Sequence, residues 1–386
     1  MKVLNIGLDK TLVGLKGPGD AVQRHREYGQ HLKSLDIIVY TKRKENLRVF
    51  EIASNVTGYP TNSRNKFFFL WDAYRIARRI YRHHQFDIVV AQDPFGAGVV
   101  GWLLKRKLKI KLQINFHGDF WRNRHFLKER WYHFIYLLIS KLTVPQADAI
   151  RVMSQGQREK LLQAGVIPQL IRVISTPVDI ERFAAFESIA SPSRMQLLND
   201  LRAQTSTQGR KTILAVGRVD KAKDDSTLFK AVRYVKARKG RDNVCFWLVG
   251  FGLSKNIPGD LLDMVTGQGG VDSDDTPAYY YASDVIVSSS SSESFGKVLV
   301  EANACGKPVV ATATLGAQEI IKDGYNGYLV PIGDSVKLAE KLIYLLENPA
   351  IAKQMGENGR ILVREKFSHN TKKIIRFWED MLAGNL

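Results

Sequence analysis

The sequence contains little cysteine, with Cys245 and Cys305 as its only two among 386 residues. Two thiols cannot build a disulfide scaffold or the usual four-ligand zinc site, so we expect a reducing compartment. The N-terminal stretch Met1–Asp9 is apolar over too few residues for a signal peptide. The longest apolar stretch, Trp131–Leu142, contains a histidine, a serine and a lysine and is shorter than the roughly 20 residues of a membrane span. We therefore expect a cytoplasmic protein that is soluble or peripheral on the cytoplasmic face of a membrane.

Acidic residues are scarce in the N-terminal half. The whole chain has 57 Lys and Arg against 38 Asp and Glu, a formal net charge of +19. Residues 1–180 hold 30 of the basic and only 14 of the acidic residues. Such a one-sided field attracts a polyanion, an anionic membrane or an acidic substrate.

The basic residues of this half form three clusters, at 63–84, 105–111 and 121–131, and the first and third of these also contain aromatic residues. In the first cluster, the residues at helical spacing are Phe67, Trp71, Tyr74, Arg75, Arg78 and Arg82. A basic amphipathic helix of this kind suits an anionic bilayer surface. The alternative is that the aromatic rings face the core and the arginines face water. No nucleic-acid-binding motif accompanies the charge, so we expect an anionic membrane surface as partner and no nucleic acid.

Short apolar strand patterns alternate with helical patterns along the chain. The expected strands cover residues 3–6, 37–40, 88–91, 112–115, 149–153, 172–175, 212–216, 244–249, 284–288, 308–311 and 327–330. The expected helices lie near residues 21–33, 66–83, 96–105, 126–141, 155–164, 226–239, 295–305, 317–322, 335–347 and 350–367. This alternation predicts an α/β protein with parallel sheets covered by helices on both faces. Ligands of such sheets bind beyond the carboxyl ends of the strands.

The length of the chain favours two domains. We expect an N-terminal Rossmann-like domain over residues 1–183 and a C-terminal one over residues 211–367. Residues 184–210 have no strand pattern, and their Ser-, Pro- and Gly-containing stretches are typical of a linker with a helix inside.

Two carboxylates, Glu293 and Glu301, stand eight residues apart around Gly296. If a helix begins near Gly296, backbone N–H groups at its start form an anion site that the helix dipole favours. The residues around this anion site are Ser294, Phe295, Gly296 and Lys297. Glu301 could accept hydrogen bonds from a ribose diol and Glu293 from a group attached to the phosphate, which predicts a nucleoside-diphosphate sugar as ligand. The alternative is that Glu301 is a solvated helix residue and Glu293 only caps the helix.

The segment 288–331 resembles the large retaining glycosyltransferase family 4 of the GT-B fold. It contains that family's E-x7-E motif at Glu293 and Glu301, then a helix of small residues and the pattern G-x-P-V-V-A at 306–311. The pattern E-I-I-x-D-G-x-N-G-x-L-V follows at 319–330. The resemblance implies two Rossmann-like domains that face each other across a cleft.

Two further stretches of the C-terminal half also match this family. Gly217-Arg218 with Lys223 resembles its G-R-L…K-G element, and Gly250 with Gly252 resembles its strand-ending G-x-G. A guanidinium and an ammonium just past a strand can neutralise a diphosphate leaving group. Glycines let the backbone approach a ligand closely. The alternative for Lys223 is a surface ion pair with an aspartate of the same loop.

In the N-terminal half, His117 ends a strand pattern and is similar to the family's histidine that contacts the donor sugar. A single histidine is more often structural. Gly17 and Gly19 resemble the glycine-rich loop that lets the acceptor and diphosphate approach the backbone. The resemblance also implies that a C-terminal helix, at about 368–386, packs back on the N-terminal domain.

One string, Asp272–Asp274, has the D-x-D form that binds a metal in the other glycosyltransferase fold. It follows a glycine-rich segment at 266–270 that we expect to be a loop, and we interpret the string as a solvated turn. No other metal-binding motif is present, so we expect no metal and no cofactor.

The resemblance implies a retaining, metal-independent glycosyltransferase that moves a hexose-type sugar from a UDP- or GDP-linked donor to a hydroxyl of a glycan or lipid-linked acceptor, as in polysaccharide or glycolipid assembly. The catalytic residues would be His117, Arg218, Lys223 and Glu293. The donor-binding residues would be Gly17, Gly19, Gly217, Gly250, Gly252, Ser294, Phe295, Gly296, Lys297 and Glu301. The alternatives are a nucleic-acid- or membrane-binding protein on an inactive scaffold of this fold, and a sugar-nucleotide epimerase of the same fold.

Overall fold

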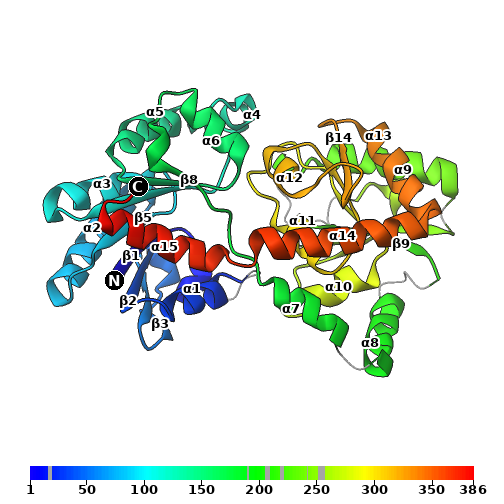
Figure 1. The fold of residues 1–386 in the computed structure, drawn as a ribbon, viewed down its shortest axis with the longest axis horizontal. Coiled ribbons are helices and arrows are strands. Elements are labelled where there is room, and N and C mark those ends of the chain that lie inside the picture. The colour runs from blue at the N-terminus through cyan, green and yellow to red at the C-terminus, as the bar shows by residue number, and fades with distance from the viewer. Residues whose placement is uncertain (16–19, 189–190, 205–208, 218–220, 241, 251–256) are drawn as a thin grey trace. The chain divides into compact units, whose positions relative to one another are not determined.

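The computed structural model describes the chain except for residues 16–19, 189–190, 205–208, 218–220, 241 and 251–256 (Figure 1). It divides into two compact units. Unit 1 comprises Met1–Ser175 together with His369–Leu386, and unit 2 comprises Thr176–Ser368. Each unit contains one mainly parallel sheet with helices packed on it, so the expected α/β class is confirmed.

Unit 1 is built on an eight-stranded sheet with the order β3-β4-β2-β1-β5-β6-β7-β8. Its strands are β1 (Lys2–Gly7), β2 (Ser34–Val39), β3 (Phe50–Ala53), β4 (Val56–Pro60), β5 (Ile88–Ala91), β6 (Lys111–Phe116), β7 (Ala149–Val152) and β8 (Ile171–Val173). Its helices are α1 (Ala21–Gly29), α2 (Lys66–His83), α3 (Gly96–Leu108), α4 (Arg124–Glu129), α5 (His133–Thr143), α6 (Gln155–Leu162) and α15 (Asn370–Ala383). Because strand side chains alternate between faces, Leu4 and Ile6 join the core with α2 and α3, whereas Val3 joins the core with α1 and α15.

Unit 2 is built on a six-stranded parallel sheet with the order β11-β10-β9-β12-β13-β14. Its strands are β9 (Lys211–Val216), β10 (Val244–Val249), β11 (Val265–Gln268), β12 (Val285–Ser288), β13 (Val309–Thr312) and β14 (Gly327–Val330). Its helices are α7 (Ile180–Ala185), α8 (Ser191–Gln204), α9 (Asp225–Lys239), α10 (Thr276–Ala282), α11 (Lys297–Ala304), α12 (Leu315–Ile320), α13 (Ser335–Glu347) and α14 (Pro349–Phe367). Phe246 and Leu248 of β10 share a core with α9 and α13, while Trp247 between them contacts Tyr279 of α10.

The expected strands all overlap strands of the structure, but β3, β4 and β11 were not predicted. In β4, Gly58 interrupts the apolar pattern because a Cβ there would lie 1.9 Å from the carbonyl oxygen of Leu12. The glycine-rich segment at 266–270 was expected to be a loop, and this was wrong, since Val265–Gln268 pairs in parallel with β10. The expected helix at 126–141 is two helices, α4 and α5, separated by a turn after Glu129.

The boundary between the units differs from the expected one at residue 183. Unit 1 ends at Ser175, because α7 is part of unit 2, where Phe183 is buried against Tyr280. The expected linker, 184–210, is also part of unit 2. It contains α8, whose Arg202 guanidinium donates two hydrogen bonds to the backbone oxygen of Ala282, the last residue of α10.

The C-terminal helix α15 packs on the sheet of unit 1 (Figure 1). Its buried Ile374 and Trp378 join the core of α1 and β1, and the Trp378 ring lies edge-on to Tyr28 at 5.9 Å. At its start, the Asn370 amide donates a hydrogen bond of 2.8 Å to the Ser175 hydroxyl. These contacts make residues at the end of the chain an integral part of unit 1.

A buried polar chain crosses the core of unit 1 near the carboxyl ends of β1 and β5. The Gln92 amide nitrogen donates to Asn5 Oδ1 at 2.6 Å, and the Asn5 amide nitrogen lies 3.1 Å from His25 Nε2. His25 Nδ1 in turn donates to the backbone oxygen of Ala21 at 2.7 Å. The amide donor of Asn5 requires Nε2 to be an acceptor, so the imidazole is neutral. Burial lowers the pKa of His25 to about 4.

We predict that His25 makes unit 1 sensitive to acid. The unfolded chain takes up a proton at His25 near a pKa of about 6.5, whereas the folded chain does so only near 4, so stability is lost as the pH falls between these values. This linkage destabilises the wild type by about 2 kcal/mol between pH 7 and pH 5. Urea unfolding of the full chain at both pH values checks it. His25→Gln should lose less stability than the wild type over this range, and equal losses in both proteins would contradict the prediction.

Candidate active site

The candidate site lies in unit 2 at the point where the winding of the sheet reverses. The neighbours of β9 are β10 on one side and β12 on the other. Ligands of doubly wound sheets bind at such a switch point, beyond the carboxyl ends of the strands. Lys223 follows β9 and Glu293 follows β12, so both lie in loops that leave this edge.

These two predicted residues form an ion pair. The Lys223 ammonium nitrogen lies 2.6 Å from Glu293 Oε2. Their side chains are 29 % and 25 % exposed, so the pair is accessible to a ligand. The structure therefore joins a cation and a carboxylate that lie 70 residues apart in the chain.

Serine residues hold the turn that carries Lys223. The Ser289 hydroxyl donates to the backbone oxygen of Lys223 at 2.8 Å, and the backbone N–H of Ser291 donates to the oxygen of Ala222 at 2.8 Å. Sequence reasoning did not assign a role to these serines. The signal that could have identified them is the run of five serines directly before Glu293.

The predicted anion site coincides with the start of α11. Gly296 has a φ of 90°, in the left-handed region that favours glycine, and no side chain caps the helix there. The first backbone N–H groups of a helix attract an anion. Ser294 is buried just before this turn. The Phe295 ring packs edge-on against Phe367 in the core, so only the backbone of Phe295 could take part in ligand binding.

Glu301 lies one turn further along α11 and is held from two sides. It is only 7 % exposed, its Oε2 accepts a hydrogen bond of 2.7 Å from the Tyr280 hydroxyl, and its Oε1 lies 3.2 Å from the Lys297 ammonium. Burial and the neighbouring carboxylate hold the pKa of Tyr280 well above its ordinary value, so the phenol remains a donor. Glu301 is therefore a positioned, buried carboxylate and not a solvated helix residue. Sequence reasoning missed Tyr280, since only packing brings α10 against α11.

Close backbone contacts fix the loops of this edge. A Cβ on Gly250 would lie 1.8 Å from the carbonyl oxygen of Gly217, so the ends of β9 and β10 approach each other only with glycine at Gly250. A Cβ on Gly316, which was not predicted as a site residue, would lie 2.3 Å from the backbone oxygen of Phe295. Four residues singled out in the sequence lie outside the described residues, namely Gly17, Gly19, Arg218 and Gly252.

His117 lies in unit 1, directly after β6, and belongs to the polar chain described above. Its Nε2 lies 2.6 Å from Gln92 Oε1, which also accepts a hydrogen bond of 3.1 Å from the Asn115 amide. Because the carbonyl of Gln92 is an acceptor, Nε2 carries the proton and Nδ1 is the acceptor nitrogen of the ring. The side chain is exposed, but the surrounding protein and the charges of Arg151 and Arg24 lower the pKa of His117. The imidazole is therefore neutral at physiological pH.

No three His, Cys, Asp or Glu side chains gather in an arrangement that could hold a metal within the described parts of the chain. Asp274 of the D-x-D string forms an ion pair with Arg182 at 3.1 Å, and its side chain is 89 % exposed. Residues 269–271, outside any helix or strand, separate the string from β11, and residues 273–275 form a turn before α10, as expected for the string.

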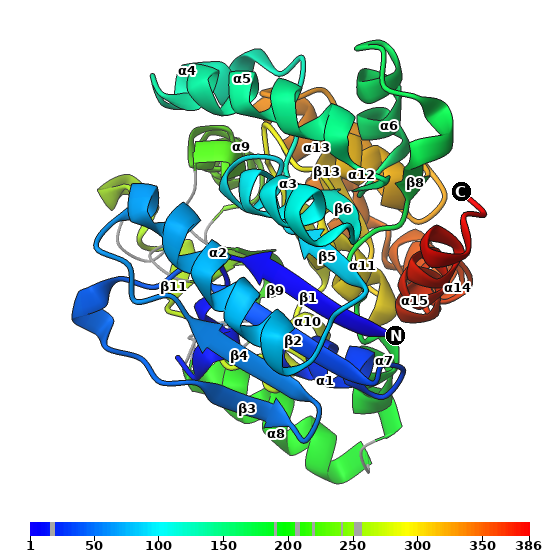
Figure 2. The same cartoon turned by 90° about the vertical axis from the view of Figure 1, so that its left-hand side faces the viewer.

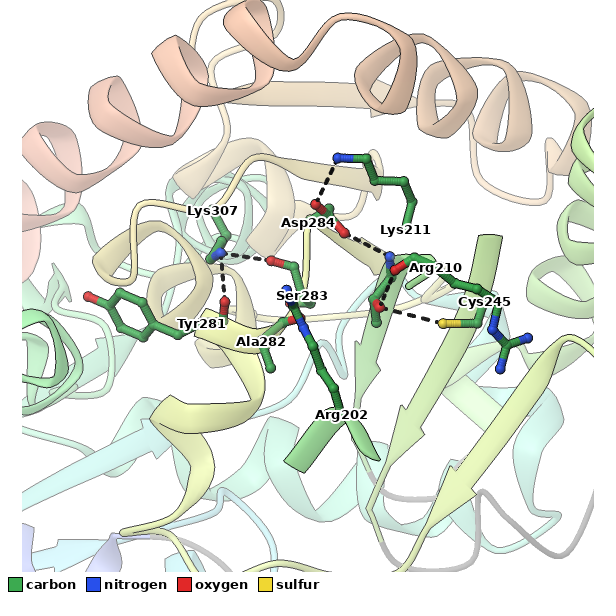
Figure 3. A network of polar contacts seen from close by, with 10 residues as sticks. Arg202, Arg210, Lys211, Cys245, Tyr281, Ala282, Ser283, Asp284 and Lys307 are labelled. Atoms are coloured by element: carbon green, nitrogen blue, oxygen red, sulfur yellow. Dashed lines mark hydrogen bonds and ion pairs between the residues drawn. The ribbon is translucent and has the colours of Figure 1, made fainter. Parts of the chain in front are cut away.

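A second polar cluster lies at the opposite, amino ends of β12 and β13 (Figure 3). The Lys307 ammonium donates to the backbone oxygens of Tyr281 and Ser283 at 3.0 and 2.7 Å, and burial lowers its pKa to about 8. Asp284 accepts a hydrogen bond from the backbone of Thr212 at 2.8 Å. These contacts tie strands and helices together at the far edge of the sheet, and we assign them a structural role.

Comparisons with known proteins agree with this geometry. Residues 26–182 match the family model Glycosyltransferase Family 4, and residues 199–362 match Glycosyl transferases group 1. An uncharacterized glycosyltransferase of Methanocaldococcus jannaschii is 26 % identical over 372 residues, which cover 91 % of each chain.

Two solved structures align over the whole of both chains at 21 % identity. Sucrose-phosphate synthase from Thermosynechococcus elongatus has a TM-score of 0.81, and Anabaena HepE in complex with UDP-glucose has a TM-score of 0.75. At this identity the likeness shows the fold. Together with the two family models, it shows that the chain belongs to the family 4-like glycosyltransferases of the GT-B fold.

Proposed function

We propose that this glycosyltransferase moves a hexose-type sugar from a UDP- or GDP-linked donor to a hydroxyl of a glycan or lipid-linked acceptor, with retention of configuration. Such a reaction belongs to cell-surface polysaccharide or glycolipid assembly. The observation that carries the proposal is the Lys223–Glu293 ion pair beside the start of α11, with the buried Glu301 one turn further on. The complex of the similar HepE with UDP-glucose supports this class of donor.

Each group of the site has one role in this proposal. The Lys223 ammonium and the N-terminus of α11 stabilise the charge that develops on the leaving diphosphate, together with Arg218, so the reaction needs no metal ion. Glu293 orients the sugar through its hydroxyls, and Glu301 accepts hydrogen bonds from the ribose. His117 contacts the donor sugar through its acceptor nitrogen. The glycines at 17, 19, 217, 250 and 252 let the backbone approach the donor.

The contacts of the carboxylates support a mechanism without a covalent sugar–enzyme intermediate. Glu293 pairs with Lys223, and Glu301 is held by Lys297 and Tyr280, so neither is arranged as the nucleophile of a carboxylate pair. In our proposal, the acceptor hydroxyl attacks on the face from which the diphosphate departs. A phosphate oxygen of the leaving group takes the proton from that hydroxyl.

The charge distribution supports an acceptor at an anionic membrane. Residues 1–180 carry most of the excess of basic over acidic residues. Among the described residues, no helix is long and apolar enough to cross a bilayer. We infer peripheral attachment to the cytoplasmic face of a membrane, where a nucleotide sugar and a lipid-linked acceptor can meet.

A metal-free binding screen tests the donor site. UDP, GDP, ADP and their common sugar conjugates are offered to the wild type, Glu301→Ala and the control Glu340→Ala, whose glutamate is exposed on α13. We expect one base to raise the melting temperature of the wild type and the control. Calorimetry should show binding to Glu301→Ala that is about tenfold weaker or more, because hydrogen bonds to a carboxylate are lost. Equal affinity of all three proteins for every nucleotide, or no binding at all, would contradict the proposal.

Tyr280→Phe tests whether the buried phenol positions Glu301. The substitution removes one hydroxyl and keeps the packing of the ring, so we expect a folded protein whose affinity for the nucleotide is about fivefold lower. The loss should appear in the KM for the donor much more than in kcat, since the phenol does not reach the reacting atoms. A fall in kcat with unchanged KM would contradict this role.

A further inference from the structure

Helix α5 presents its apolar side to solvent and its polar side to the protein. Phe134, Leu138 and Leu142 are 52 %, 53 % and 63 % exposed, whereas His133 and Ser140 are buried. A surface helix that packs only on its own core shows the reverse pattern. The residues of the exposed apolar stripe, which we call the α5 stripe, are Trp131, Phe134, Ile135, Leu138 and Leu142.

Three polar contacts fix the rotation of this helix. His133 Nδ1 donates to the backbone oxygen of Phe126 at 2.7 Å, and the Trp121 indole N–H donates to the Ser140 hydroxyl at 2.8 Å. The Thr143 hydroxyl donates to the backbone oxygen of Pro94. Rotation that buried the α5 stripe would break these contacts and leave buried polar groups unsatisfied. These contacts of α5 with unit 1 therefore hold the α5 stripe towards solvent.

Basic residues surround the α5 stripe. Lys128, Arg130 and Lys141 are exposed beside it, and Trp131 at its start is 78 % exposed. Tryptophan beside arginine and lysine is typical of the water–membrane interface, where an indole ring lies at the level of the lipid headgroups.

The same side of unit 1 continues over two more helices. Helix α3 lies between α2 and α5 and contacts both (Figure 2). The exposed residues of α2 are aromatic in its first turns, with Phe67 and Trp71, and basic further along, with Arg75 and Arg79. The exposed residues near the end of α3 are Arg106, Lys107 and Lys109. Helices α2, α3 and α5, which lie side by side, thus all carry exposed apolar or cationic groups.

We propose that the α5 stripe is a membrane-docking element that inserts into the interfacial layer of an anionic bilayer, with the cations of α2 and α3 on the lipid headgroups. The proposal rests on the proposed function in one respect, since it locates the membrane contact that the function includes. The exposure and the contacts of α5 support it independently. Amphipathic elements of this kind bind by apolar insertion plus attraction to anionic lipid.

Charge favours a bilayer over a second copy of the chain as the occupant of the stripe. A symmetric contact through α5 would bring Lys128, Arg130 and Lys141 of one copy towards the same cations of the other. Like charges at an interface oppose association. An anionic lipid surface instead neutralises these cations while it takes up the apolar side chains.

Sedimentation with phosphatidylcholine vesicles, with and without phosphatidylglycerol, tests the proposal on the full chain. We expect the wild type to bind the anionic vesicles and the double variant Phe134→Ser, Leu138→Ser to bind about a hundredfold more weakly, or about tenfold for each side chain withdrawn from the lipid. The matched control is Leu262→Ser, Ile361→Ser, which removes two apolar side chains of unit 2 that are at least as exposed, and it should bind like the wild type. Insertion should also shift the tryptophan emission to shorter wavelength, and Trp131→Phe should bind while losing most of that shift.

Two results would overturn the proposal. One is equal vesicle binding by the wild type and the α5 double variant, or no binding by the wild type. The other is a wild-type dimer in analytical ultracentrifugation that the α5 double variant abolishes, which would assign the stripe to a second copy. Nucleotide affinity separates this test from the proposed function, because the α5 variant should bind the donor nucleotide like the wild type in the absence of vesicles.

Discussion

The ion pair between Lys223 and Glu293 is the contact around which the candidate active site of unit 2 is organised. It joins the loop after β9 to the loop after β12, which flank the switch point of the parallel sheet. Each charge neutralises the other, and both side chains remain partly exposed. The ion pair therefore forms without a large desolvation penalty. In the proposed function, the diphosphate approaches the ammonium and the sugar hydroxyls approach the carboxylate, at groups that the ion pair already positions.

The residues that match the family motif divide into those that could contact a ligand and those that shape the scaffold. Gly250 of the G-x-G element has a scaffold role besides its proposed one at the donor, because the carbonyl oxygen of Gly217 leaves no space for a side chain there. Gly316, which lies outside the matched patterns, is confined in the same way by the backbone of Phe295. Asn326 is fully buried and donates to the backbone oxygen of Ile320, and Asp323 accepts a hydrogen bond from the backbone of Leu329. These contacts of the D-G-x-N-G pattern build the turn into β14, and the Asn326 amide also donates to Asn303 of α11.

The sequence predicts well what depends on local pattern. Apolar runs such as 244–249 identify buried parallel strands, and the glycine before Lys297 identifies a helix start. The sequence predicts poorly the features that depend on contacts between residues far apart in the chain. The strand β11 has a glycine in it and exists because β10 offers a free edge, and the Tyr280–Glu301 hydrogen bond requires α10 to lie against α11. Likewise, the pattern of 126–141 predicts a helix but not the break in it.

The two members of the ion pair have different roles in the proposed function, since Lys223 binds the diphosphate and Glu293 binds the sugar. Calorimetry should compare Lys223→Met and Glu293→Gln with the wild type, each against the free nucleoside diphosphate and its sugar conjugate. We expect Lys223→Met to weaken binding of both ligands by about tenfold or more, because a charged contact to the diphosphate is lost. Glu293→Gln should weaken binding of the sugar conjugate alone. If both variants bound both ligands as tightly as the wild type does, these roles of Lys223 and Glu293 would be contradicted.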